Sequence, residues 1–151
     1  MNRNTVKATF TIERTFTAPP ARVFKAFADK QSKARWFAGP PGWQEHESSF
    51  DFRVDGRETM VGRHGSGTVS GFYAVYHDIV PDQRIVYAYR MTLDGVPISS
   101  SLASIELRAE GTGTHMTLTE YGVFLDSYDG VASREQGSNW LMDQLGKSLL
   151  D

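Results

Sequence analysis

The sequence has no cysteine, no long apolar run and no block of positive charge. The lack of cysteine excludes disulfides, thiolate metal sites and a cysteine nucleophile. No apolar stretch approaches the ~18 residues that span a bilayer, and the N-terminal MNRNTVKATF lacks the apolar core of a signal peptide. We therefore expect a cytoplasmic protein without a membrane span.

Charge is balanced along the chain. The formal net charge is -2, and the 16 lysines and arginines occur singly. A nucleic-acid-binding domain usually carries a basic face, so we expect no nucleic-acid partner. The four histidines, at positions 46, 64, 77 and 115, form no HxxxH or HxH pattern. The sequence therefore predicts no metal site, and we expect no cofactor.

The composition is that of an ordinary globular protein, and 151 residues can bury a core of their own. We expect one domain over residues 1–151. Residues 5–17 alternate between apolar and polar side chains, which predicts a half-buried strand. Pro19 and Pro20 end this strand and favour a short helix over residues 21–28. Asp29 can cap a second short helix that continues through residues 33–37.

A series of strands is predicted from Gln44 to Phe124. Turn signals such as Asp55-Gly56, Pro81-Asp82 and Asp94-Gly95 recur every 10 to 15 residues, which favours antiparallel neighbours in a meander. The predicted strands cover residues 45–53, 57–64, 68–80, 85–93, 98–110 and 115–124.

The alternation within these strands predicts which side chains face inward, because residues two apart lie on the same face of a strand. In the last three strands the inward residues are Ile85, Tyr87, Tyr89 and Met91, then Ala103, Ile105 and Leu107, then Met116, Leu118 and Glu120. This register places the Glu120 carboxyl among apolar neighbours.

The last stretch, Ser133 to Asp151, is the best candidate for a long helix. Ser133 and Gln136 have the spacing of a capping box. Leu141, Leu145 and Leu149 recur at helical spacing and would clamp the helix to the sheet. The same face continues towards the N-terminus through small and polar residues, which are Arg134, Gly137 and Ser138. We therefore expect the helix to seal one half of a cavity and to border its open half.

A strand, two short helices, a curved antiparallel meander and a long C-terminal helix make an α+β helix-grip fold. Five stretches also resemble one known superfamily. They are residues 15–24 (TFTAPPARVF), 36–40 (WFAGP), 51–58 (DFRVDGRE), 76–87 (YHDIVPDQRIVY) and 113–120 (GTHMTLTE). One departure is Asp55, which stands where the superfamily usually has a first glycine.

In order and spacing, these stretches resemble the START-like (SRPBCC) superfamily, in the branch related to the C-terminal domain of the activator of the heat-shock-protein-90 ATPase. The resemblance covers nearly the whole chain and implies a deep cavity between the sheet and the long helix. Across the superfamily this cavity holds lipids, polyketides and other hydrophobic molecules. The superfamily also includes carriers, cyclases, hydroxylase subunits and co-chaperone domains, so the resemblance does not decide the function.

The predicted cavity combines aromatic and apolar walls with a few polar groups. Its predicted lining consists of Trp36, Phe37, Met60, His64, Tyr87, Tyr89, Met91, Met116, Leu118, Glu120, Arg134, Gly137 and Leu141. Glu120 is the sharpest chemical candidate, because a carboxyl desolvated in an apolar cavity can act as a general base near neutral pH. The alternative is a structural ion pair between Glu120 and Arg134.

Three hypotheses for the function follow. The first is a protein that binds or carries a small hydrophobic molecule, such as a lipid, a polyketide or an aromatic compound. The second is a cyclase or aldol-type enzyme with Glu120 as the base. The third is a co-chaperone-like module that stimulates a heat-shock ATPase, and it is the weakest because no charged docking surface stands out. Whether the chain is an enzyme, and whether it forms a homodimer, is left open.

Overall fold

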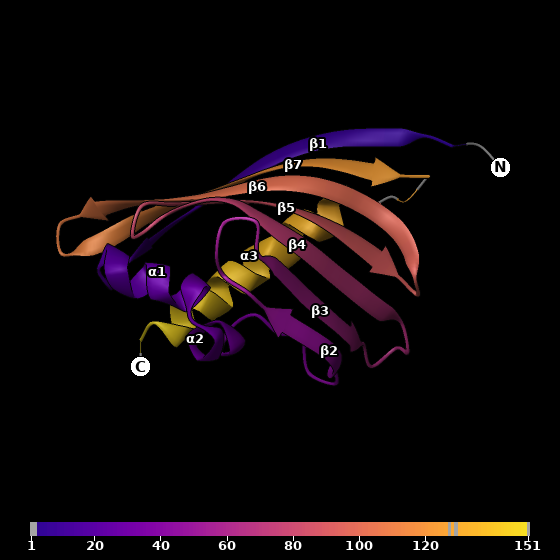
Figure 1. Ribbon diagram of the computed structural model, residues 1–151, viewed down its shortest axis with the longest axis horizontal. Coiled ribbons are helices and arrows are strands. Elements are labelled where there is room, and N and C mark those ends of the chain that lie inside the picture. Colours follow the sequence, from indigo (N-terminus) through magenta and orange to yellow (C-terminus); the bar gives the residue numbers. More distant parts are fainter. Residues whose placement is uncertain (1–2, 127, 129, 151) are drawn as a thin grey trace.

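The computed structural model describes residues 3–126, 128 and 130–150, which form one curved sheet and three helices (Figure 1). The strands are β1 Thr5–Phe16, β2 Gln44–Phe50, β3 Arg57–Arg63, β4 Val69–Val80, β5 Arg84–Leu93, β6 Val96–Glu110 and β7 Gly113–Leu125. The helices are α1 Pro20–Ala28, α2 Lys30–Ala34 and α3 Val131–Ser148. The predicted α+β helix-grip fold is confirmed, since α3 crosses the concave face of the sheet.

The sheet is a meander with one long-range addition. The strand order is β1-β7-β6-β5-β4-β3-β2, and all neighbours are antiparallel. Strands β2 to β7 follow one another by hairpins, and β1 pairs with β7 from Thr5↔Leu125 to Phe16↔Thr114. The first strand, β1, is therefore an edge strand of the sheet, and the last strand, β7, lies next to it.

All three predicted turns named above contain left-handed backbone, and at Asp82 φ is 64°. Asp94 and Gly95 have φ of 50° and 81°, as expected for the tight hairpin between β5 and β6. Asp55, which replaces a glycine usual in the superfamily, has φ of 67°. Aspartate tolerates this region better than most residues, so the departure keeps the turn conformation. The turn also ends β2 at Phe50, three residues earlier than predicted.

The two short helices lie where the sequence placed them, with one shift in extent. Helix α1 begins at Pro20 and buries Val23 and Phe27. Asp29 caps α2, because its carboxylate accepts a 3.0 Å hydrogen bond from the Ser32 amide. Helix α2 ends at Ala34, whereas residues up to Phe37 were predicted to be helical. The chain turns there so that the buried Trp36 indole donates to the Ala26 carbonyl at 2.8 Å.

The long helix begins earlier than predicted. Helix α3 starts at Val131, and its N-cap residue Gly130 makes no side-chain capping bond. The predicted capping box at Ser133 is wrong, since Ser133 already lies inside the first turn. The Arg134 amide instead donates to the Gly130 carbonyl at 2.8 Å, which extends the helix by two residues. The helix ends at Ser148, and Asp151 lies outside the described residues.

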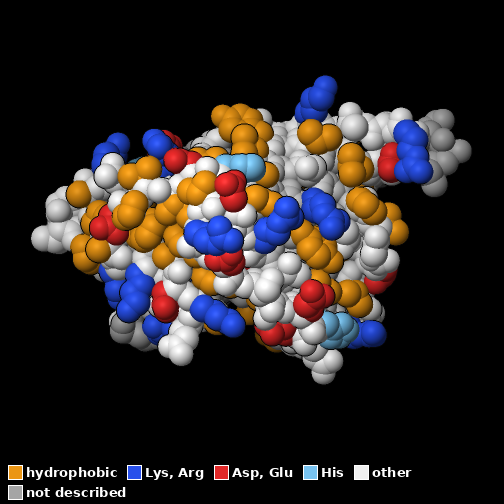
Figure 2. Space-filling model, in the orientation of Figure 1, with side chains coloured by type: hydrophobic (Ala, Val, Ile, Leu, Met, Phe, Trp, Pro, Cys, Tyr) orange, Lys and Arg blue, Asp and Glu red, His pale blue; other side chains and the backbone are white. Residues whose placement is uncertain are grey.

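The predicted division of α3 is present in the fold. Its C-terminal half is the core half, with Leu145 fully buried and Met142 and Leu149 nearly so. In its N-terminal half, five of the residues 131–139 are exposed, Val131, Arg134 and Asn139 are half-buried, and Ser138 is buried. On the outside of the molecule, lysines and arginines are interspersed with acidic side chains on the face drawn in Figure 2. Among the described residues, no helix is long and apolar enough to cross a membrane.

Candidate ligand-binding cavity

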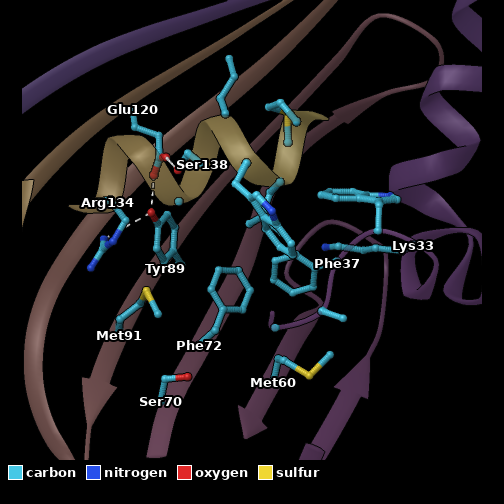
Figure 3. Close-up of a pocket in the computed structure, with 18 of the residues that line it drawn as sticks. Lys33, Phe37, Met60, Ser70, Phe72, Tyr89, Met91, Glu120, Arg134 and Ser138 are labelled. Atoms are coloured by element: carbon cyan, nitrogen blue, oxygen red, sulfur yellow. Dashed lines mark hydrogen bonds between the residues drawn. The ribbon is translucent and has the colours of Figure 1, made fainter. Parts of the chain in front are cut away.

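A cavity of about 410 Å³ lies between the concave face of the sheet and α3. Its lining includes every residue that the sequence placed there except Met116, whose side chain is completely buried. The predicted residues that line it are Trp36, Phe37, Met60, His64, Tyr87, Tyr89, Met91, Leu118, Glu120, Arg134, Gly137 and Leu141. Residues from β3, β4, β5, β7, α3 and the segment after α2 thus converge on one space (Figure 3).

Aromatic rings form a connected wall of the cavity. Phe72 links the two sides, because its ring centroid lies 5.1 Å from that of Phe37 and 5.0 Å from that of Tyr89. Along the sheet, Tyr87 lies between Tyr76 and Tyr89, at 5.9 Å from each. Phe72 and Tyr76 were missed in the sequence, although they share the alternation of β4 and so face the same side.

Glu120 lies at one end of this wall and is 4% exposed. The Tyr89 hydroxyl donates a short hydrogen bond to Glu120 Oε1, and the Ser138 hydroxyl donates to Oε2 at 3.2 Å (Figure 3). Tyr89 is on β5 and Glu120 on β7, so the tyrosine crosses over the intervening β6. The small side chains of Ser101 and Ala103 on β6, opposite these residues, leave room for it.

Opposing influences act on the pKa of Glu120. Burial raises the pKa of Glu120 above its ordinary value of 4.5, and this is the largest influence on the carboxyl. The hydrogen bond from Tyr89, the charge of Arg134 and the hydrogen bond from Ser138 act in the opposite direction. A buried carboxyl of this kind can accept or hold a proton inside the cavity.

Arg134 reaches the same cluster from the first turns of α3. Its guanidinium donates to the Tyr89 hydroxyl at 3.4 Å and to the Ser99 hydroxyl at 2.7 Å. The guanidinium carbon also lies 5.0 Å from the centre of the Phe124 ring. Among the described contacts, Arg134 is connected to Glu120 through the Tyr89 hydroxyl and makes no direct ion pair with it. The alternative of an ion pair between Glu120 and Arg134 is therefore replaced by a hydrogen-bonded link through Tyr89.

Lys33, on the opposite side of the cavity from Glu120 (Figure 3), belongs to a second polar cluster. Lys33 Nζ lies 2.6 Å from Glu58 Oε1, and the Tyr76 hydroxyl donates to the same oxygen at 2.5 Å. Burial lowers the pKa of Lys33 below its ordinary value of 10.5, and the Glu58 carboxylate opposes this shift. The sequence did not predict that Lys33 lines the cavity. Glu58 shares the alternation of Met60 on β3, which was the available signal that it faces inward.

Two features shape the rim of the cavity. His64 Nε2 and the Ser70 hydroxyl are hydrogen-bonded at 3.0 Å, and both residues contribute to the lining. The Trp43 ring lies directly against Gly62, since a Cβ atom at Gly62 would be 2.0 Å from the indole. The glycine is thus required for the position of this ring. On α3, Gly137 is exposed and has open space beside it.

The described residues hold no group of three or more histidine, aspartate or glutamate side chains placed to bind a metal ion. The polar chemistry of the cavity therefore rests on the Glu120 and Lys33 clusters and on the isolated His64–Ser70 pair.

Comparison with known proteins identifies the family. The sequence model described as "Activator of Hsp90 ATPase homolog 1-like protein" matches residues 17–149. The chain belongs to this family. The predicted place in the START-like (SRPBCC) superfamily is thereby confirmed, whereas no curated protein matches the chain significantly.

Solved structures of similar proteins share the whole fold. A protein from Rhizobium loti is 44% identical, with a TM-score of 0.89 over 96% of this chain and 99% of its own. A protein from Rhizobium leguminosarum is 40% identical, with a TM-score of 0.94 over 99% and 98%. CalU16 from Micromonospora echinospora is 18% identical, with a TM-score of 0.69 over 99% and 87%, and this similarity concerns the fold alone.

Proposed function

We propose that this protein binds a small hydrophobic molecule in the cavity between its sheet and α3. The observation that carries this proposal is the cavity of about 410 Å³ walled by aromatic side chains. Ligand pockets in proteins typically measure about 300–1,000 Å³ and combine apolar walls with a few polar groups. The Tyr89–Glu120–Arg134 cluster would orient the polar part of such a molecule, and the rings of Phe37, Phe72 and Tyr87 would contact its apolar part.

Filling the cavity tests this proposal. Met91 lines the cavity on β5, so a Met91→Trp variant should occupy part of the space. The matched control is Val96→Trp, because Val96 is 62% exposed in the following hairpin. N-phenyl-1-naphthylamine, a neutral fluorophore that brightens in apolar surroundings, serves as the probe. Native mass spectrometry of the purified protein looks for a molecule that remains bound.

We expect the wild-type protein and Val96→Trp to bind the probe alike, and Met91→Trp to bind it at least about tenfold more weakly, which corresponds to about 1.4 kcal/mol. Thermal unfolding should show that both variants remain folded. The proposal fails if all three proteins give the same titration, or if the wild-type protein binds neither the probe nor a co-purified molecule.

A second candidate function is proton abstraction from the bound molecule by Glu120. The observation that favours it is a carboxyl that lines the cavity, is almost fully buried and has a raised pKa. Incubation in D2O with a co-purified molecule should then lead to deuterium uptake at a carbon position, measured by mass spectrometry. The Glu120→Gln variant should bind that molecule equally well and show no uptake. Equal uptake in both proteins would exclude Glu120 as the base.

The family description names an activator of the Hsp90 ATPase, so stimulation of a heat-shock ATPase stays a third prediction. It is tested by the ATP hydrolysis rate of a purified heat-shock-protein-90 ATPase with increasing amounts of this protein. An unchanged rate at saturating protein would exclude it.

A further inference from the structure

Two cationic side chains of the described residues, Lys33 and Arg134, line the cavity, and they differ in how their charge is balanced. Lys33 is compensated by Glu58, whose Oε1 lies 2.6 Å from Nζ. The Tyr76 hydroxyl completes this cluster by donating to the same carboxylate oxygen. An anion that approached Lys33 would meet the negative charge of Glu58, so this end of the cavity suits a neutral part of a ligand.

Arg134 makes no direct ion pair with a carboxylate within the described part of the chain. Its hydrogen bonds go to the hydroxyls of Tyr89 and Ser99, both of which are neutral partners. No carboxylate of a described residue lies within 4.0 Å of its guanidinium. The nearest acid in its network, Glu120, is separated from it by the Tyr89 hydroxyl, which donates to Glu120 and accepts from Arg134.

The Arg134 guanidinium is also held by contacts on two sides and retains N–H donors that these contacts do not use. Both of its hydrogen-bond partners are buried side chains of the sheet, since Ser99 on β6 is 1% exposed and Tyr89 on β5 is 7% exposed. The Phe124 ring supports the group from another side at 5.0 Å. A guanidinium has five N–H donors, and these two contacts use only part of them. The remaining donors suit the two oxygens of a carboxylate, which arginine binds in bidentate fashion.

We propose that Arg134 recognises the carboxylate of the ligand, and that the ligand is an amphipathic monocarboxylic acid. This inference rests on the proposed function, because it assigns the chemical class of the molecule in the same cavity. The carboxylate lies at Arg134 beside the exposed residues Ser133 and Gly137 of α3, which also line the cavity. The apolar body lies along Phe72 and Phe37 towards the Lys33 side (Figure 3).

The experiment compares an acid with a neutral analogue of the same chain. Decanoic acid and decan-1-ol each displace N-phenyl-1-naphthylamine from the wild-type protein, from Arg134→Gln and from Arg14→Gln. Arg14 is the matched control because it contacts α3 on Asn139 and Asp143 without lining the cavity. 2-Naphthoic acid and its methyl ester form a second pair, which distinguishes an aromatic acid from an alkyl acid. Arg134→Lys keeps the positive charge and guards against a variant that fails to fold.

For at least one pair, we expect the wild-type protein and Arg14→Gln to bind the acid about tenfold or more tightly than the neutral analogue. Arg134→Gln should lose this preference and still bind the neutral analogue and the probe, and Arg134→Lys should keep a reduced preference. Equal binding of acid and neutral analogue by the wild-type protein overturns the inference, as does a preference that survives in Arg134→Gln. If neither the probe nor any of the four compounds binds, the proposed function itself fails, which is a separate outcome.

Discussion

Replacing Lys33 by methionine should destabilise the protein strongly, because it leaves the buried Glu58 carboxylate without its cation. The two side chains are 12% and 4% exposed, and their charged atoms are 2.6 Å apart. Removal of one partner from a buried ion pair typically costs about 3–5 kcal/mol. This is a large part of the roughly 5–15 kcal/mol that keeps a domain folded. For a chain of this size it corresponds to a decrease in Tm of about 6–20 °C.

The double variant Lys33→Met/Glu58→Met separates the cost of an unpaired buried charge from the net contribution of the ion pair. Replacing both members of a buried pair by apolar residues is often neutral or stabilising, so we expect the double variant to recover most of the stability. Urea unfolding followed by tryptophan fluorescence, to which the buried Trp36 contributes, gives the free energy of unfolding of each protein. The single variant Glu58→Met completes the cycle. If the loss in the double variant equals the sum of the two single losses, the pair has no coupling and the reasoning is refuted.

A surface pair provides the matched control for this cycle. Arg84 and Asp78 are joined at 2.5 Å, but their side chains are 50% and 41% exposed. Exposed ion pairs are worth about 0–1 kcal/mol, because water screens the charges and the side chains lose freedom. We therefore expect Arg84→Gln to unfold within about 1 kcal/mol of the wild-type protein. A loss as large as that of Lys33→Met would show that burial is not what makes the inner pair important.

Two further predictions concern Glu120 and Leu145. The pKa of Glu120 is higher in the folded than in the unfolded protein, so its contribution to stability is present below the unfolded value of about 4.5 and is lost as the pH rises through the folded value. The stability of Glu120→Gln relative to the wild-type protein should therefore increase between pH 4 and pH 7 in urea unfolding, and a constant difference would contradict the raised pKa. Leu145 is completely buried, so Leu145→Ala should cost about 2–5 kcal/mol. Leu150→Ala, at a side chain that is 77% exposed, should change the free energy of unfolding by less than about 0.5 kcal/mol, and similar losses in both would contradict the assigned core face of α3.

The parts of the cavity that could be predicted depend on short-range regularities. Residues two apart share a face of a strand, and this placed Tyr87, Tyr89 and Met91 on one side before the register was known. The Asp29 cap is likewise a contact over three residues. The predicted start of α3 was wrong, although Ser133 and Gln136 have the spacing of a capping box. A backbone bond from Arg134 to Gly130 extends the helix without any side-chain cap, and such a bond leaves no pattern in the residue types.

The parts that could not be predicted depend on contacts between distant segments. Lys33 and Glu58 are 25 residues apart, on α2 and β3, and nothing local in either segment indicates the other. The bond from Tyr89 to Glu120 requires three strands in one order and a small residue such as Ala103 between them. The tertiary arrangement thus decides which buried acid has a cation beside it. From the sequence, Arg134 could be named only as a candidate partner of Glu120.

The two polar clusters differ in how completely they are satisfied, and this difference assigns them different tasks. The Lys33 cluster contains a cation, an anion and a hydroxyl in mutual contact, so a ligand has little to add to it and its loss should appear as lost stability. In the Tyr89–Glu120–Arg134 cluster the guanidinium is held by two hydroxyls and makes no direct ion pair, so under the proposal above a ligand carboxylate completes it. Substitution at Arg134 should accordingly change ligand preference more than the free energy of unfolding. The two halves of α3 thus have different roles, because the polar N-terminal half presents Arg134 to the cavity and the apolar C-terminal half holds the helix on the sheet.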